Sequence, residues 1–239
     1  MRKLTRSPEP EALARLRRAQ KKNANLDWDV AQGEDKKAIW SALDAMQEKL
    51  CAYCESELAE NKRHIEHFYP RNGQQARREL RFAWANLFGS CNDPYCCGKH
   101  KDNSAKNWRC EDLIKPDQDD TDDFLQFLTS GEIHPKPGLP QELRHKAQET
   151  IRVFNLDCAG SPLRAKRMKA ISGWWKSLDE ILQEIDVLQQ EGLYSAAEAD
   201  AQKREELKKL LQQTISLPFA TAIRHALVVT CHVGPDKLE

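Results

Sequence analysis

The chain has 239 residues, with 37 basic and 37 acidic side chains, so its zero net charge gives no general argument for binding nucleic acid. No apolar run approaches the roughly 20 residues that a membrane helix needs, and the first residues lack the apolar stretch of a signal peptide. We therefore expect a cytoplasmic protein with no membrane partner. In that compartment, reduced thiols favour metal binding over disulfides.

Two helices are predicted in an N-terminal helical segment, residues 1–50. Pro8 and Pro10 precede a helix-forming run that starts at Glu11, and proline suits the first turn of a helix. A second helix is predicted over about 35–50, because apolar residues recur at helical spacing, at Ile39, Leu43, Met46 and Leu50. This second helix ends at the first cysteine, so it delivers that cysteine from a rigid element.

The next fifty residues concentrate metal-binding side chains, with five of the eight cysteines and three of the seven histidines. Cys51 and Cys54 form a C-x-x-C pair, and Cys91 forms a second pair with Cys96 or Cys97. Four soft thiolates favour a closed, tetrahedral zinc site with a structural role.

The identity of the fourth zinc ligand stays open between two adjacent cysteines. The interval to His100 favours Cys96 as the residue that starts a helix, and we take it as the first choice. Counting back from Lys101 favours Cys97 as the alternative. Two further residues are alternative ligands, Asn92 and His64.

An alternating run between the cysteine pairs, HIEHFYP from His64, predicts a strand that ends at Pro70. The motif W-x-N-L follows at Trp84, and K-D-N lies beyond the second cysteine pair. Together with C-x-x-C, these motifs resemble an HNH endonuclease, whose active site is a ββα-metal finger. The chain most resembles the PtuB type, the HNH partner of an ATPase in Septu anti-phage defence and in some retron systems. The resemblance extends more weakly to N-L-D at Asn155 and the residues after it, Leu163 and Arg167.

The resemblance implies a role for each polar residue of the motif. It makes His67 the general base and Asn86 the residue that orients the loop and the base. Glu66 and His100 are the expected ligands of a catalytic Mg²⁺ or Mn²⁺. Such a cation neutralises charge that develops on the scissile phosphate, and a neutral imidazole is a suitable base near pH 7.

Charge is unevenly distributed along the chain. Residues 62–109 carry ten basic and four acidic side chains, whereas residues 111–132 carry eight acidic side chains and one lysine. A basic surface around the finger would face a phosphate backbone. The predicted nucleic-acid contacts are Arg71, Arg77, Arg78, Arg81 and Lys101, and the alternative interpretation is a solvated surface.

After the nuclease core, residues 51–110, we predict a hairpin and a helix that pack on it, residues 111–160. A C-terminal helical region, residues 161–239, contains three further predicted helices, at 162–190, 195–215 and 219–229. Trp174 and Trp175 are adjacent on the first of these and cannot both face one core, so one is a candidate anchor for a partner.

The predicted fold class is α+β, mostly α, with a ββα-metal finger and a four-cysteine zinc site inside a helical body. The predicted function is a metal-dependent HNH endonuclease that hydrolyses nucleic acid, with DNA preferred and RNA as the alternative substrate. The resemblance implies an anti-phage complex with an ATPase of the PtuA type, and a retron reverse transcriptase with its nucleic acid as a further candidate partner. The alternative function is a non-catalytic, zinc-stabilised nucleic-acid-binding or protein-adaptor module.

Overall fold

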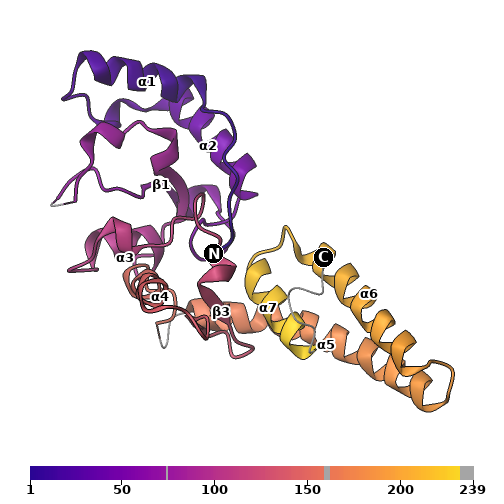
Figure 1. Ribbon diagram of the computed structural model, residues 1–239. Coiled ribbons are helices and arrows are strands. Elements are labelled where there is room, and N and C mark those ends of the chain that lie inside the picture. The colour runs from indigo at the N-terminus through magenta and orange to yellow at the C-terminus, as the bar shows by residue number, and fades with distance from the viewer. Residues whose placement is uncertain (74, 159–161, 232–239) are drawn as a thin grey trace. The chain divides into compact units, whose positions relative to one another are not determined.

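The computed structural model describes residues 1–73, 75–158 and 162–231 (Figure 1). It is mostly helical and contains two small sheets of two strands each, in agreement with the predicted α+β class. The chain divides into two compact units. The first combines Met1–Leu125 with Pro135–Leu156, and the second combines Gln126–His134 with the chain from Asp157 onward. Within the described residues, no helix is long and apolar enough to cross a membrane.

The two helices predicted for the start of the first unit are present, but the second ends at Gln47 and not at the first cysteine. Helix α1 spans Glu11–Lys22 and helix α2 spans Gly33–Gln47. Their apolar faces share one core with two aromatic residues of the following segment, and its members include Leu13, Leu16, Ile39, Leu43, Phe82 and Trp84. Burial of these side chains supplies most of the driving force for placing the helices against the sheet.

The end of α2 is fastened to the first sheet by one buried side chain. The Gln47 amide donates hydrogen bonds to the carbonyls of Leu50 at 2.7 Å and Gly89 at 2.9 Å, and it accepts one from the Gly89 N–H at 2.7 Å. A buried amide with its polar atoms satisfied fixes geometry. The turn that carries the first cysteine pair is therefore held at a defined position beside the sheet.

Strand β1, Arg63–His67, pairs antiparallel with strand β2, Leu87–Cys91. The register places His67 opposite Leu87 and Arg63 opposite Cys91. Helix α3, Cys97–Asn103, follows after a connection of five residues and packs against β2. The predicted strand is present, but it ends at His67 and not at Pro70, and β1, β2 and α3 succeed one another in the order that a ββα arrangement requires.

The remainder of the first unit includes a helix that packs against α3. Helix α4 spans Gln141–Val153, and the Phe154 ring that follows it stacks on Tyr53 with ring centroids 4.1 Å apart. The Phe154 carbonyl accepts a 2.8 Å hydrogen bond from the Cys97 N–H, so the start of α3 is anchored as well. The division between the units passes through a short hairpin of β3, Leu125–Phe127, and β4, Ile133–Pro135.

The second unit is built on helices α5, Pro162–Gln190, α6, Ala196–Thr214, and α7, Ala220–Thr230 (Figure 1). Helix α6 begins with a capping box between Ser195 and Glu198. Buried Arg167 donates to the Gly131 carbonyl at 2.7 Å and to the Asp157 carboxylate at 3.2 Å. Within this unit, the N-L-D…R segment thus contributes a buried ion pair.

The exposed surface of α5 includes one of the two adjacent tryptophans. Trp175 is 41 % exposed, whereas Trp174 is partly buried. Because neighbouring residues on a helix point in different directions, this outcome follows directly from their adjacency. Trp175 remains the candidate anchor for a partner.

Candidate active site and metal-binding cysteines

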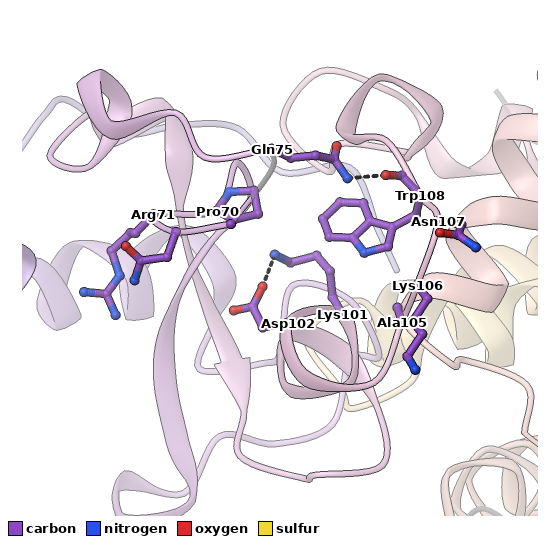
Figure 2. A pocket seen from close by; sticks show the side chains of 11 residues that line it. Pro70, Arg71, Gln75, Lys101, Asp102, Ala105, Lys106, Asn107 and Trp108 are labelled. Atoms are coloured by element: carbon purple, nitrogen blue, oxygen red, sulfur yellow. Dashed lines mark hydrogen bonds and ion pairs between the residues drawn. The ribbon is translucent and has the colours of Figure 1, made fainter.

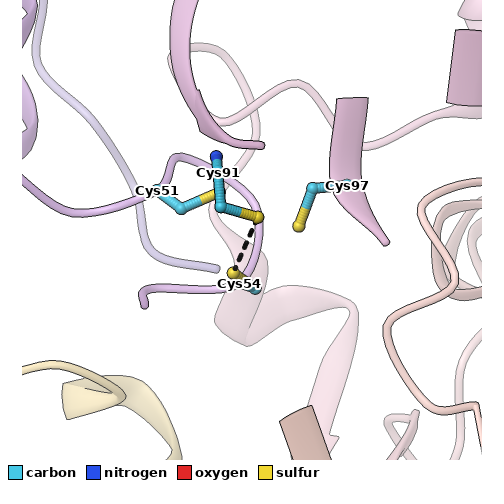
Figure 3. Close-up of side chains that lie close together, drawn as sticks. All are labelled: Cys51, Cys54, Cys91 and Cys97. Carbon is cyan, nitrogen blue, oxygen red and sulfur yellow. Dashed lines mark hydrogen bonds between the residues drawn. The ribbon is translucent and has the colours of Figure 1, made fainter. Parts of the chain in front are cut away.

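Four cysteine sulfurs gather at one place in the first unit (Figure 3). The Sγ atoms of Cys51, Cys54, Cys91 and Cys97 all lie within 4.8 Å of one another, and those of Cys54 and Cys91 are 3.9 Å apart. A tetrahedral zinc ion with bonds of about 2.3 Å separates its sulfur ligands by about 3.8 Å. The donor set and its spacing therefore fit a single tetrahedral metal ion that would join the turn after α2, the end of β2 and the start of α3.

For the fourth ligand position, the structure favours Cys97, which was the alternative prediction. Cys96 was the first choice, and its Sγ lies 3.9 Å from that of Cys91. It is Cys97, however, whose Sγ is within 4.8 Å of those of the other three cysteines. The Cys97 backbone is in the left-handed region, with φ of 56°. Cys96 is a fifth buried thiol beside the site.

The two remaining alternative ligands lie outside this cluster. His64 Nε2 is 3.1 Å from a Glu66 oxygen, and Asn92 is exposed. Within the described residues, the cysteine cluster is the one group of three or more His, Cys, Asp or Glu side chains with donor atoms close enough to hold a metal ion.

His67 ends strand β1 with its imidazole buried, only 5 % exposed. Its Nε2 lies 2.9 Å from the Arg81 carbonyl oxygen, which can only accept a hydrogen bond, so Nε2 carries the proton. Nδ1 is then the atom with a lone pair, and no described protein atom hydrogen-bonds to it. Burial lowers the pKa of His67 to about 4, and the ring is neutral at pH 7. The arrangement presents a neutral base at Nδ1.

Asn86 hydrogen-bonds to the chain segments that position the imidazole of His67. Its Oδ1 accepts from the Tyr69 N–H at 2.7 Å, and its Nδ2 donates to the carbonyls of Tyr69 at 3.1 Å and Leu80 at 3.2 Å. Tyr69 follows the histidine by two residues, and Leu80 directly precedes Arg81. Asn86 is therefore a positioning residue that fixes both chain segments on which the orientation of His67 depends.

Glu66 is buried, at 1 % exposure, and ionised. Burial by itself would raise its pKa, but the Lys101 ammonium and the hydrogen bond with His64 lower the pKa to about 2. The Oε1 atom is 2.8 Å from Lys101 Nζ. A Cβ atom at Gly98, on α3, would lie 2.3 Å from Oε2, so glycine leaves the space that the carboxylate occupies.

Lys101 supplies the positive charge beside Glu66, and it too is only 1 % exposed. Its Nζ donates to the Asp102 carboxylate at 2.6 Å and to the His67 carbonyl at 3.2 Å. Burial alone would lower the pKa of Lys101, but the Glu66 and Asp102 carboxylates outweigh it and raise the pKa. The charged form of Lys101 is thus favoured, and its ammonium donates to the backbone carbonyl of the candidate base.

The two predicted ligands of a catalytic cation do not form a ready ligand set in this structure. Glu66 is paired with Lys101. His100 is partly buried, and its Nδ1 lies 2.9 Å from the Val153 carbonyl. Both side chains therefore have protein partners at these atoms, and their role as ligands of a hard divalent cation stays a prediction.

The five predicted nucleic-acid contacts separate into two groups. Arg71, Arg77 and Arg78 lie wholly or partly at the surface, and the first two have carboxylate partners at 3.5 Å or more. Arg81 is 5 % exposed, and its guanidinium binds the Leu26 carbonyl. Because Lys101 is also buried, the structure gives these last two residues protein partners in place of an open surface. Contact with phosphate remains a prediction for the first three.

A pocket of about 570 Å³ adjoins this site, between the loop after β1 and the segment after α3 (Figure 2). It is lined by Lys101 and Asp102 of the K-D-N motif and by residues that the sequence interpretation did not single out, including Asn107 and Trp108. The sequence indicated this pocket only through the position of Trp108, which lies seven residues beyond Lys101 of the K-D-N motif.

The comparisons with known proteins agree with this geometry at a coarse level. No protein-family model matches the chain. A protein of Vibrio cholerae serotype O1 biovar El Tor, named "Retron Vc95 putative HNH endonuclease", is 28 % identical over 137 residues, which are 55 % of this chain and 63 % of that protein. The matched region thus spans less than two thirds of that relative. This distant similarity supports a relationship to HNH endonucleases and a nuclease function.

Replacing Lys101 by methionine removes the cation from a buried pair and leaves the Glu66 charge uncompensated. We expect Lys101→Met to lower the free energy of unfolding by about 3–5 kcal/mol, measured by chemical denaturation at neutral pH. Lys99→Met, on the same helix, is the matched control and should change it by less than about 0.5 kcal/mol. Equal effects of the two substitutions would contradict the buried pair.

Lys101→Met should also change how the free energy of unfolding depends on pH. The pKa of Glu66 in the fold, about 2, lies below its ordinary value of 4.5, so the pair stabilises the protein above that ordinary value and loses this effect as the pH falls. In Lys101→Met, burial raises the pKa of Glu66 and favours the neutral carboxyl. The stability difference between the two proteins should therefore shrink from neutral pH towards about pH 3.

Proposed function

We propose that the chain is an HNH-type endonuclease that hydrolyses phosphodiester bonds, with β1, β2 and α3 as its ββα finger. The observation that carries the proposal is the state of His67, whose Nε2 is held by the Arg81 carbonyl while Nδ1 has no described protein partner. The motif around it and the distant relative named as a retron HNH endonuclease support the same activity.

In this proposal, Nδ1 of His67 takes a proton from the water that attacks phosphorus. A pKa of about 4 makes the imidazole a weak base in the protein alone. A substrate phosphate beside the ring favours the imidazolium form and raises that pKa, so proton transfer becomes easier when substrate binds. Asn86 holds the ring in place, and the surface arginines Arg71, Arg77 and Arg78 are the proposed phosphate contacts.

The proposed metal of the cysteine cluster is zinc, which would have a structural role. Four thiolates suit zinc, and a closed site of this kind leaves no position for substrate. The resemblance also implies a catalytic Mg²⁺ or Mn²⁺. Glu66 Oε1 and His100 Nδ1 have protein partners, so no step is assigned to this ion, and dependence on these cations is a variable in the test below.

The biological setting is proposed from the retron named in the relative and from the PtuB resemblance. The chain would be an effector of anti-phage defence, working with an ATPase of the PtuA type and, in a retron, with a reverse transcriptase and its nucleic acid. DNA is the proposed substrate, and RNA is the alternative because the chemistry needs no 2′-hydroxyl. Exposed Trp175 on α5 is the proposed contact for a protein partner.

The second candidate is a non-catalytic nucleic-acid-binding or adaptor module. The observation that favours it is the Glu66–Lys101 pair, which occupies the carboxylate expected to hold a catalytic cation. In that case the finger would be a scaffold stabilised by metal. Binding without turnover is its expected behaviour.

Cleavage of DNA tests the two candidates directly. The purified protein is incubated with supercoiled and single-stranded DNA, with and without Mg²⁺ or Mn²⁺. We expect His67→Ala to reduce the cleavage rate by at least about 100-fold, since general-base catalysis contributes that much or more. Asn86→Ala should also slow cleavage, because the ring loses its support. His134→Ala, in the second unit, is the matched control and should cleave normally.

Full activity of His67→Ala would exclude His67 as the base. Absence of cleavage by every form, including in the presence of the partner ATPase, would favour the adaptor function.

The assignment of the fourth thiolate is tested by metal content. We expect about one zinc per chain in the wild type, loss of most of it in Cys97→Ser and retention in Cys96→Ser, because three protein ligands hold zinc less tightly than four. Mass spectrometry of purified variants measures the zinc. The opposite pattern would assign Cys96, and full retention in Cys51→Ser would contradict the site as a whole.

A further inference from the structure

The pocket of about 570 Å³ in the first unit has a composition that the cleavage chemistry does not explain (Figure 2). Its volume is within the range of ligand sites, about 300–1,000 Å³. It lies close to the candidate base, because Lys101 lines it and donates from Nζ to the His67 carbonyl at 3.2 Å. On its other side, Arg71 is only four residues after that histidine.

The loop that carries Trp108 is anchored by hydrogen bonds to its backbone. Gln75 donates from its side chain to the Trp108 carbonyl and accepts a 2.9 Å hydrogen bond from the Cys110 N–H. Arg152 donates to the carbonyls of Lys106 at 3.1 Å and Asn107 at 3.3 Å. These four hydrogen bonds fix the backbone of the loop, and Lys101 Nζ lies 5.2 Å from the centroid of the indole ring. Such a pre-organised aromatic ring loses little entropy when a ligand stacks on it.

The polar side chains of the pocket complement a nucleobase. The amides of Asn72 and Asn107 are exposed and have no hydrogen-bond partner within the described residues, so each offers a donor and an acceptor. Asp102 is 44 % exposed and adds an acceptor. Donors and acceptors side by side are the pattern that the edges of bases require.

The charged side chains at the pocket complement a phosphate. Lys106 is exposed, and no described residue is its ion-pair partner. The Arg71 guanidinium lies 3.6 Å from Asp27, at the outer limit of an ion pair, and is partly exposed. An aromatic ring, unpaired amides and two cations in one pocket are together the chemistry that recognises a nucleotide.

We propose that this pocket binds one unpaired nucleotide next to the scissile phosphate, with its base stacked on Trp108. The proposal rests on the proposed phosphodiester cleavage and specifies its substrate class. A base inside a duplex is paired and stacked and cannot enter a pocket, so the nucleotide comes from a single strand or is turned out of a duplex.

Binding rather than cleavage tests the proposal, so that it can fail separately from the nuclease activity. His67→Ala protein is titrated with a fluorescent single-stranded DNA of defined sequence, with the same strand carrying central abasic sites, and with the matching duplex. Wild-type protein with a phosphorothioate strand repeats the series in case the variant does not fold. Each titration is repeated with Trp108→Ala and with Trp175→Ala as the matched tryptophan control.

The intact single strand should bind at least about tenfold more tightly than the abasic strand, which corresponds to about 1.4 kcal/mol or more of stacking. Trp108→Ala should abolish that difference, and Trp175→Ala should preserve it. If the base can be turned out of a duplex, a duplex with one mismatched base should bind more tightly than the perfect duplex. If only single strands enter the pocket, the two duplexes should bind equally. Equal binding of intact and abasic strands, or an equal loss for both in Trp108→Ala, would overturn the proposal.

Discussion

The gathering of thiols at the junction of β2 and α3 is the constraint on which the rest of the first unit depends. Two cysteines stand on a turn after α2, one ends β2, and the adjacent pair Cys96 and Cys97 stands at the start of α3. The sheet of β1 and β2 has only two strands, and α3 is a short helix, so these elements are too small to be stable alone. A metal ion bound by four thiolates would join three chain segments, in addition to the contacts that Tyr53 makes with Phe88 and Phe154.

The placement of α3 beside the sheet also allows the charged side chains of Glu66 and Lys101 to be buried as a pair. With α3 fixed against β1, Gly98 leaves room for the Glu66 carboxylate and Lys101 reaches it at 2.8 Å. Removing one partner of such a pair leaves an unpaired charge in a region without water, which is costly. The same ammonium contacts the carbonyl of His67, so the charge pair and the position of the candidate base are linked through one side chain.

The sequence predicted local features well and tertiary partners poorly. Helix α5 was predicted with its observed limits, and the start of α1 and the range of α2 nearly so, because apolar spacing and proline positions are local properties. The choice between Cys96 and Cys97 turned on a left-handed residue, which spacing does not reveal. Arg81 and Lys101 were predicted as basic surface residues, yet both are buried, because their partners lie far away in the sequence at Leu26 and Glu66.

The central claim is that His67 is a neutral imidazole with its proton on Nε2 and Nδ1 available to take another. Long-range ¹H–¹⁵N NMR of histidine side chains, recorded across a pH titration and assigned with a His67→Gln variant, measures the tautomer and the pKa together. We expect the Nε2–H tautomer and a pKa of about 4 for His67. A proton on Nδ1, or an imidazolium form that persists at neutral pH, would contradict it.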